Sequence, residues 1–320
     1  MNWARRNGWI LGLLAMLVAL LIATKIIQPG FGATGLDSLG RSALPFAFAT
    51  AAQVVVVIAG GVDLSVGALM AVASVSAAVM MDQGVNTVLV VVLVLGMGLV
   101  MGAINGLLIV LTKVPDIVVT LAMLFVWEGV ALLILNAPGG AADPALRGLI
   151  LGGLVIPGVP EAWTVWIPRS VVTLAICLAV VWLPLRRSKL GLSIYAIGSD
   201  PLAAFRSGVN IGATRVAAYA LAGLFAAMGG LGLTMSTGIG EPIPGPYLLA
   251  SVAAVVLGGV VLGGGRGGLL GPIIAVFILR LVRLDLTLLS VDPNVTTIIE
   301  GTIMVVVVMI GGLLAARGRR

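Results

Sequence analysis

The chain has 320 residues, of which 60% are hydrophobic and only 9% are charged, and its mean hydropathy is +1.22. So few polar side chains cannot cover a soluble globule of this size, and the composition predicts an all-α integral membrane protein with one membrane domain over residues 1–320. The net charge of +6 falls in the gaps between apolar runs and is not interleaved with aromatic residues. It therefore indicates membrane orientation and argues against nucleic-acid binding.

The residue types also exclude several kinds of chemistry. The chain has no histidine, and its one cysteine, Cys177, lies in an apolar run. A disulfide framework, a thiolate or imidazole metal site and a histidine-dependent serine triad are therefore excluded. None of the three lysines lies in a G-x-x-x-x-G-K-[ST] loop, so we expect no ATP bound through a P-loop, no metal, and no enzymatic activity in this chain.

Apolar runs of membrane-crossing length, or slightly less, recur along the whole chain, and we expect about ten transmembrane helices. The first run follows Arg5 and Arg6 as a signal peptide would, but no clear small-x-small cleavage site follows it, so an uncleaved helix is expected. The runs cover residues 9–24, 43–59, 66–81, 88–111, 117–135, 171–185, 216–235, 247–262, 269–284 and 295–314.

The distribution of Lys and Arg orients these helices, because short loops rich in these residues stay in the cytoplasm. A cytoplasmic N-terminus places six basic residues outside, namely Lys25, Arg41, Arg147, Arg169, Arg280 and Arg283. It places twelve inside, namely Arg5, Arg6, Lys113, Arg186, Arg187, Lys189, Arg206, Arg215, Arg266, Arg317, Arg319 and Arg320. The excess predicts that both termini and the loop 186–215 are cytoplasmic, and that residues 136–169 form a large external loop.

Two glycine-rich stretches interrupt the helices. Residues 60–67 read GGVDLSVG, and residues 258–268 in the second half read GGVVLGGGRGG. Irregular backbone at membrane depth is tolerated only where it is buried in protein or lines a cavity. Similar breaks in the two halves also hint at an internal repeat.

Five polar residues in or beside the spans are candidates for a translocation path: Asp63, Ser65, Asn105, Thr120 and Glu128. Asp63 precedes a helix, so it either caps that helix or contacts a solute. Asn105 and Thr120 either hold helices together or face a path. Glu128 is a functional candidate because an ionised group deep in a span is costly.

Two further charges are expected to meet in the membrane. Glu300 lies several residues into the last span, and Arg280 lies a similar distance from the end of the preceding antiparallel span, so we expect a structural ion pair. An ion-coupled carrier usually needs several intramembrane acids, and only Asp63, Glu128 and Glu300 are available here. The sequence therefore favours an energy source on another chain.

The loop 186–215 contains the pattern of a short helix. Asp200 or Ser199 is a suitable N-cap, Pro201 suits the first helical position, and Gly208 provides the stop. Such a helix carries Leu202 and Phe205 on one face, three residues apart. It is either a solvated or interface-lying loop or a docking site for a partner.

Four stretches resemble the permease subunits of bacterial ABC importers of the ribose, xylose, rhamnose and autoinducer-2 type. They are AGGVDLSVGALMAV, INGLLIVLTKVPDIVVTLAMLFVWEGVALL, YAIGSDPLAAFRSGVN and AAVVLGGVVLGGGRGGLLGPIIAV. The resemblance covers roughly residues 43–312 in order. This chain departs from it by carrying acids at Glu128 and Glu300, where relatives often carry a basic residue nearby.

The resemblance implies a cytoplasmic ATPase subunit that binds ATP and Mg²⁺, a second permease copy or paralogue, a periplasmic solute-binding protein, and a place in the bacterial inner membrane. It implies a monosaccharide-like solute, with nucleosides or branched-chain amino acids as the alternative and an ion-coupled carrier as a further one. It also implies that residues 195–210 dock on the ATPase, with the contact carried by Tyr195, Ser199, Asp200, Pro201, Ala204, Phe205, Arg206 and Gly208.

Overall fold

The computed structural model describes residues 8–243 and 245–317, and every regular element in that part of the chain is a helix. Arg5, Arg6, Arg319 and Arg320, which entered the orientation argument, lie outside the described residues. The helices are α2 (Gly8–Ile27), α3 (Ala33–Ile58), α4 (Val66–Asp82), α5 (Thr87–Thr112), α6 (Asp116–Ile134), α7 (Pro144–Gly148), α8 (Glu161–Thr164), α9 (Arg169–Arg187), α10 (Lys189–Ser199), α11 (Pro201–Arg206), α12 (Ile211–Thr237), α13 (Tyr247–Leu257), α14 (Leu270–Leu288) and α15 (Pro293–Arg317).

Six of these helices are long and apolar enough to cross a membrane: α2, α3, α5, α6, α9 and α12. Two more, α4 and α13, are apolar but shorter, because each adjoins one of the glycine-rich breaks. Helix α14 carries Arg280, Arg283 and Asp285 within its 19 residues. The structure therefore gives a multi-pass membrane protein, and the expected total of about ten crossings stays a prediction.

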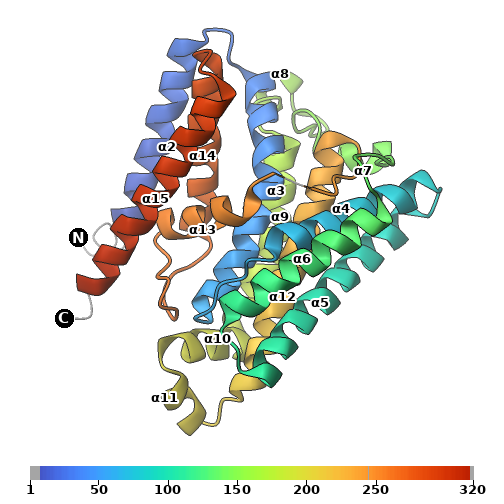
Figure 1. Ribbon diagram of the computed structural model, residues 1–320. Helices are drawn as coiled ribbons and strands as arrows, with labels where there is room; N and C mark the ends of the chain where they lie inside the picture. The colour runs from blue at the N-terminus through green and yellow to red at the C-terminus, as the bar shows by residue number, and fades with distance from the viewer. Residues whose placement is uncertain (1–7, 244, 318–320) are drawn as a thin grey trace.

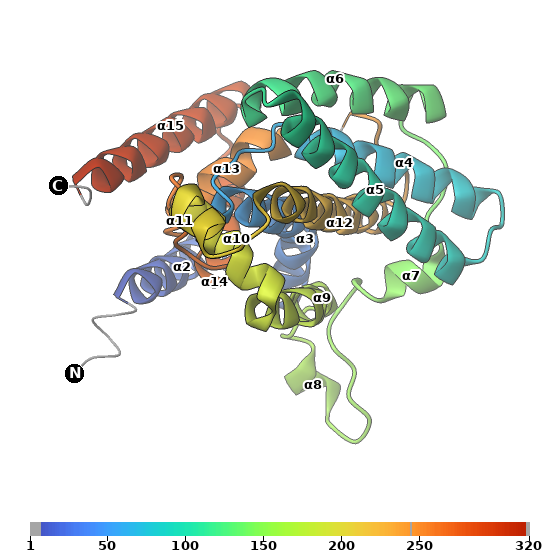
Figure 2. The same cartoon turned by 90° about the horizontal axis from the view of Figure 1, so that it is seen from below.

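Helices α3 and α12 form the centre of the bundle, and the other helices surround them when the molecule is seen from below (Figure 2). Helix α12 packs against α5, α3 and α4. It approaches α5 closely because glycines face each other: a Cβ on Gly223 would lie 2.9 Å from the Cα of Gly102, and a Cβ on Gly98 would lie 2.5 Å from the carbonyl oxygen of Gly223. Small residues at a helix crossing let two backbones come together where apolar solvent provides no hydrophobic driving force.

The two glycine-rich breaks meet inside the protein. The first separates α3 from α4, the second separates α13 from α14, and the backbone N–H of Gly265 donates to the carbonyl of Ile58 across them at 2.9 Å. Gly198 of α10 sits against both breaks, since a Cβ there would collide with the Ile58 carbonyl oxygen and lie 2.6 Å from the Gly265 nitrogen. The irregular backbone is thus covered by protein, as its position in a membrane domain requires.

The two long loops lie at opposite ends of the bundle (Figure 1). Helices α10 and α11 occupy the lower end of the view, whereas α7 and α8 lie at its upper end. The start of α2 and the end of α15 both point toward the lower side, where α11 lies. The loop 186–215 and the loop 136–169 are therefore on opposite sides of the membrane domain.

The glycine contact between α5 and α12 predicts a strong difference between two Gly→Ala changes. Gly223→Ala inserts a methyl group against the α5 backbone, and such overpacking costs typically ~1–3 kcal/mol. Gly96→Ala on α5 is the matched control, because nothing lies within 4 Å of its Cβ position and alanine is the better helix former. We expect a lower melting temperature in detergent for Gly223→Ala only. Equal melting temperatures for the two variants would contradict the close crossing.

Candidate functional site

The predicted short helix is present as α11, and its N-cap is Asp200. One carboxylate oxygen of Asp200 accepts hydrogen bonds from the backbone N–H groups of Leu202, at 2.9 Å, and Ala203, at 3.0 Å. Pro201 occupies the first turn. Ser199, the alternative cap in the sequence, instead lies with its hydroxyl 3.5 Å from the carbonyl oxygen of Gly265. The cap joins Asp200 to residues only two and three positions later in the chain, which explains why the sequence could predict it.

The end of α11 is also formed as predicted. Gly208 has a φ of +84°, a backbone conformation that glycine adopts without steric cost. Its N–H donates to the carbonyl of Phe205 at 2.9 Å, and that of Val209 donates to the carbonyl of Ala204 at 3.0 Å. Ala204 is buried, whereas the side chain of Arg206 points to solvent. Helix α11 is therefore a helix of six residues that is capped at both ends.

Helix α11 exposes two large apolar side chains. Phe205 is 65% exposed and Leu202 is 59% exposed, and at a spacing of three residues they share one face. They lie at the end of the bundle that carries α10 and α11 (Figure 1). A small apolar face on a helix that is capped at both ends is suited to binding in a groove on another protein.

Helix α10 fixes α11 to the membrane domain. The hydroxyl of Tyr195 donates to the carbonyl of Gly267 in the second break at 2.9 Å. Burial raises the pKa of the Tyr195 phenol, so it stays protonated, and hence a donor, at neutral pH. Together with the contact of Gly198 against Ile58 and Gly265, this bond places both breaks in contact with the segment that carries α11.

Four of the five path candidates come together as one buried polar cluster. The hydroxyl of Ser65 donates to Asp63 at 2.6 Å and accepts from the amide of Asn105 at 2.8 Å. The indole N–H of Trp127 donates to the Asn105 oxygen at 3.0 Å. Asp63, Ser65 and Asn105 are fully buried. The cluster joins the first break to α5 and α6.

Thr120 completes this cluster from α6. Its hydroxyl oxygen accepts from the backbone N–H of Leu64 at 3.1 Å and bonds the carbonyl of Asp116, in its own helix, at 2.8 Å. It is also fully buried. Asp63 differs from the predicted helix cap: it accepts from the N–H of Ser65, which is itself the N-cap of α4. Asp63 therefore closes a turn one residue before the helix begins.

Glu128 does not join the cluster. Its side chain is half-buried, and within the described residues it makes neither a side-chain hydrogen bond nor an ion pair.

A group of contacts that the sequence did not predict lies near α11. The hydroxyl of Tyr219 donates to Asp116 at 2.9 Å, and Arg215 approaches the same carboxylate at 3.9 Å. These contacts join the start of α6 to the start of α12, which follows α11 directly.

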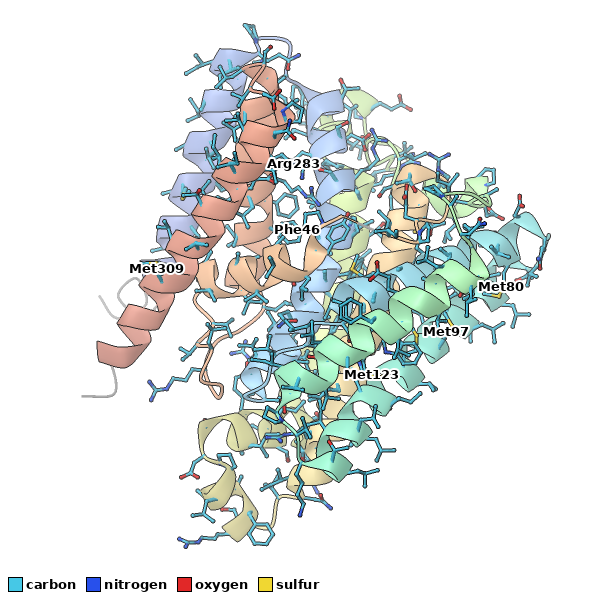
Figure 3. The ribbon with its side chains drawn as sticks, in the orientation of Figure 1. Phe46, Met80, Met97, Met123, Arg283 and Met309 are labelled. Atoms are coloured by element: carbon cyan, nitrogen blue, oxygen red, sulfur yellow. The ribbon has the colours of Figure 1, made fainter. Side chains whose placement is uncertain are left out.

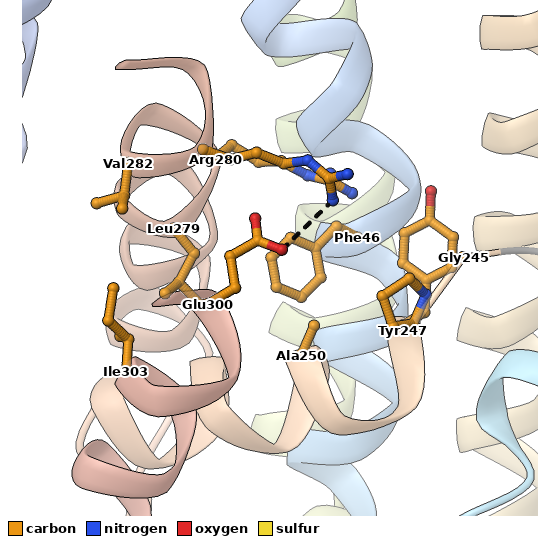
Figure 4. A pocket seen from close by; sticks show the side chains of 11 residues that line it. Phe46, Gly245, Tyr247, Ala250, Leu279, Arg280, Val282, Glu300 and Ile303 are labelled. Atoms are coloured by element: carbon orange, nitrogen blue, oxygen red, sulfur yellow. Dashed lines mark ion pairs between the residues drawn. The ribbon is translucent and has the colours of Figure 1, made fainter. Parts of the chain in front are cut away.

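A pocket of about 260 Å³ lies between α3, α13, α14 and α15 (Figure 4). The polar side chains in it are Tyr247, Arg280, Arg283 and Glu300, and Phe46 forms part of its wall. The guanidinium of Arg280 lies 5.0 Å from the centre of the Phe46 ring and 5.8 Å from that of Tyr247. The sequence had paired Arg280 with Glu300 but had not joined Phe46, Tyr247 and Arg283 to them, because the five residues come from four helices.

The predicted ion pair of Arg280 with Glu300 is replaced in the structure by a pair of Arg283 with Glu300, about one helical turn away on α14. The carboxylate of Glu300 lies 3.6 Å from the guanidinium of Arg283, and Figure 4 marks this pair with a dashed line. Arg280 and Arg283 are three residues apart on α14, about 4.5 Å along the axis. Matching the depths of two antiparallel spans in the sequence cannot resolve a difference of that size.

The buried cluster predicts that Ser65→Ala destabilises the protein. Alanine leaves the Asn105 amide without its acceptor and removes one of the two hydrogen bonds that Asp63 accepts from residue 65, at about 1–3 kcal/mol for a buried unsatisfied group. Ser193→Ala is the matched control, because Ser193 is only half-buried and its hydroxyl bonds only within its own helix. We expect a lower melting temperature for Ser65→Ala alone. An unchanged melting temperature would argue that Ser65 is not a structural residue.

Comparison with known proteins agrees with this architecture. A family model described as "Branched-chain amino acid transport system / permease component" matches residues 35–308. The autoinducer 2 import system permease protein LsrD of Escherichia coli strain K12 is 30% identical over 313 residues, which cover 95% of this chain and 92% of the relative.

The LsrD proteins of Shigella flexneri and of Escherichia coli O157:H7 match with the same identity and the same coverage. No solved structure matches the chain. The family model spans well over half of the sequence, and it includes the buried cluster, α11, both breaks and most of the pocket. The chain therefore belongs to the family of transport-system permease components that this model describes.

Proposed function

We propose that this chain is the transmembrane permease subunit of an ATP-driven ABC importer, and that α11 receives the motion of the ATPase subunit. The observation that carries the coupling role is the capped helix with Phe205 and Leu202 exposed on it. Similarity to permease proteins over 95% of the chain supports the subunit's identity. No enzymatic family is indicated by these relatives, and in this proposal ATP and Mg²⁺ are bound by the partner ATPase.

The route from α11 into the membrane is short. Helix α10 contacts both breaks through Gly198 and Tyr195, and α12 begins five residues after α11 ends. A displacement of α11 therefore moves α10 against the breaks and pulls on the start of α12, where Arg215 and Tyr219 contact Asp116. Two packings of these helices would then alternate access to the path.

The proposal also specifies which side of the membrane each loop faces and which proteins assemble with the chain. Loop 186–215 and both termini face the cytoplasm, loop 136–169 faces the periplasm of a bacterial inner membrane, and the chain crosses that membrane about ten times. In this count α4, α13, α14 and α15 add to the six longer spans. A second permease copy or paralogue completes the path, and a periplasmic binding protein delivers the solute.

The solute proposed is monosaccharide-like. The relatives named above are autoinducer 2 import permeases, the group of importers that the sequence resembles, whereas the family description names branched-chain amino acids. An ion-coupled carrier is less well supported. Asp63, its best candidate for an ion site, has one carboxylate oxygen held by Ser65 and is fully enclosed.

The coupling role predicts that Phe205→Asp uncouples transport from ATP. The variant would bring a carboxylate into a desolvated apolar groove on the ATPase, and burying even an unpaired polar group there costs about 2–7 kcal/mol. The ATPase should therefore dissociate, or hydrolyse ATP without import. The measurements are co-purification of the ATPase subunit and ATP-dependent uptake in proteoliposomes. The permease itself should insert and fold, because Phe205 is 65% exposed.

Val159→Asp is the matched control for Phe205→Asp. Val159 is also exposed, at 40%, and lies in the loop at the other end of the bundle. We expect the ATPase to co-purify normally with this variant. Normal ATP-driven uptake by Phe205→Asp at normal expression would place the coupling site elsewhere in the chain.

A further inference from the structure

We propose that the pocket between α3, α13, α14 and α15 is a binding site for the solute inside the membrane domain, and that it takes a small uncharged polyhydroxyl compound. The proposal rests on the proposed transport function and names the part of the path that recognises the solute. The sequence named Asp63, Ser65, Asn105, Thr120 and Glu128 as candidates for the path, with a structural role as the alternative for Asp63, Asn105 and Thr120. Four of those five residues are sealed into a structural cluster, which leaves them no free polar atoms directed at a path except one oxygen of Asp63.

Arg280 is the central observation. Its guanidinium lies over the Phe46 and Tyr247 rings, and among the described residues no carboxylate lies within ion-pair distance of it. Its buried Nε has no hydrogen-bond partner there. A guanidinium has five N–H donors in a fixed plane, and a charged group within a membrane span is retained for function unless it is paired. Arg280 is therefore poised to donate to a molecule in the pocket.

The other side chains define the chemistry of that molecule. Glu300 is only 18% exposed and adds carboxylate acceptors beside the donors of Arg280 and Arg283. A hydroxyl group both donates and accepts, so adjacent hydroxyls satisfy both kinds of residue at once. The rings of Phe46 and Tyr247, 6.4 Å apart, add apolar area against which the carbon skeleton of a small solute packs.

Size and charge narrow the class further. A space of about 260 Å³ equals roughly nine water molecules at ~30 Å³ each, and it lies below the ~300 Å³ at which pockets for drug-sized ligands begin. A solute of about ten non-hydrogen atoms fits. Arg283 and Glu300 compensate each other as an ion pair, which leaves the pocket a net charge of +1 from Arg280. We commit to an uncharged solute because hydroxyl groups match the donors and the carboxylate acceptor together, and the phosphate ester in the test below decides against an anion.

The position of the pocket suits the first binding site that a solute meets on a path into the cell. Figure 3 places Arg283 and Phe46 in the upper half of the bundle, away from α11. Gln53 lies seven residues after Phe46 on α3 and hence on the same helix face, toward the end that carries α11. It is fully buried, and neither amide atom has a partner among the described residues. It offers a second polar contact farther along the same face.

The test measures binding without the ATPase. Ala250 lines the pocket, so Ala250→Cys in a Cys177→Ala background gives a single thiol whose alkylation rate reports occupancy. The probes are D-ribose, D-xylose and L-rhamnose at millimolar concentration, with D-ribose 5-phosphate as the anionic counterpart of the first. We expect at least one neutral sugar to slow alkylation threefold or more. Arg280→Gln should abolish this protection, and Thr287→Val, on an exposed position of α14, should preserve it.

Three outcomes would overturn the proposal: no protection by any neutral sugar, protection that survives Arg280→Gln, or stronger protection by the phosphate ester. Folded yield and melting temperature of Arg280→Gln distinguish binding from a structural role, since the proposal predicts that both stay near the parent values. The proposed function fails by a different measurement, namely uptake that needs no ATPase. A positive binding result together with ATP-independent uptake would therefore support the pocket as a solute site and contradict the ABC mechanism.

Discussion

The contact between the two helix breaks is the constraint on which the rest of the structure depends. Backbone N–H and carbonyl groups that leave a helix at membrane depth need partners within the protein, and here the Gly265 N–H and the Ile58 carbonyl serve each other. Glycines at positions 198, 264 and 265 bring three backbone segments close enough for this arrangement. Because α10 is one of the three segments, it connects both breaks to α11, the helix that follows it.

The polar residues of the first break have a related role. Asp63, Ser65, Asn105, Thr120 and Trp127 connect the break to α5 and α6 through side-chain hydrogen bonds. On the other side, glycines hold α5 against α12, and α12 begins beside α11. The first break, the central helix and α11 therefore form one connected unit, whereas the pocket lies where α13, α14 and α15 meet α3.

The sequence predicted local features well and spatial groupings poorly. The cap at Asp200 and the glycine stop at Gly208 depend on neighbours within a few residues, so they could be read directly. The sequence also named the residues of the buried cluster but left open whether Asp63, Asn105 and Thr120 are structural or face a path. The spacing of Ser65, Asn105 and Thr120 along the chain does not reveal that they hydrogen-bond to each other or to the break. The predicted partner of Glu300 was wrong by one turn.

The pocket could not be predicted at all from the pattern of the chain. The pocket residues come from four helices, and Phe46 and Glu300 are 254 residues apart in the chain. Phe46 and Tyr247 look like ordinary residues of apolar runs in the sequence. The available signals were the unusual charge of α14, whose two arginines were assigned to the outside set, and the expected pairing of Arg280 with Glu300. In the structure Arg280 lies over two aromatic rings and Arg283 pairs with Glu300, a placement that a topology argument does not consider.

The most direct test of the account changes Gly198 and measures import against ATP hydrolysis. Gly198→Ala adds a methyl group where α10 meets Ile58 and Gly265, and it leaves the exposed face of α11 intact. The quantity is the number of solute molecules imported per ATP hydrolysed by the assembled complex in proteoliposomes. Ser193→Ala, which removes a hydroxyl that bonds only within α10, is the control. The account predicts that this ratio falls at least tenfold for Gly198→Ala while the ATPase stays bound. An unchanged ratio in an assembled complex would contradict it.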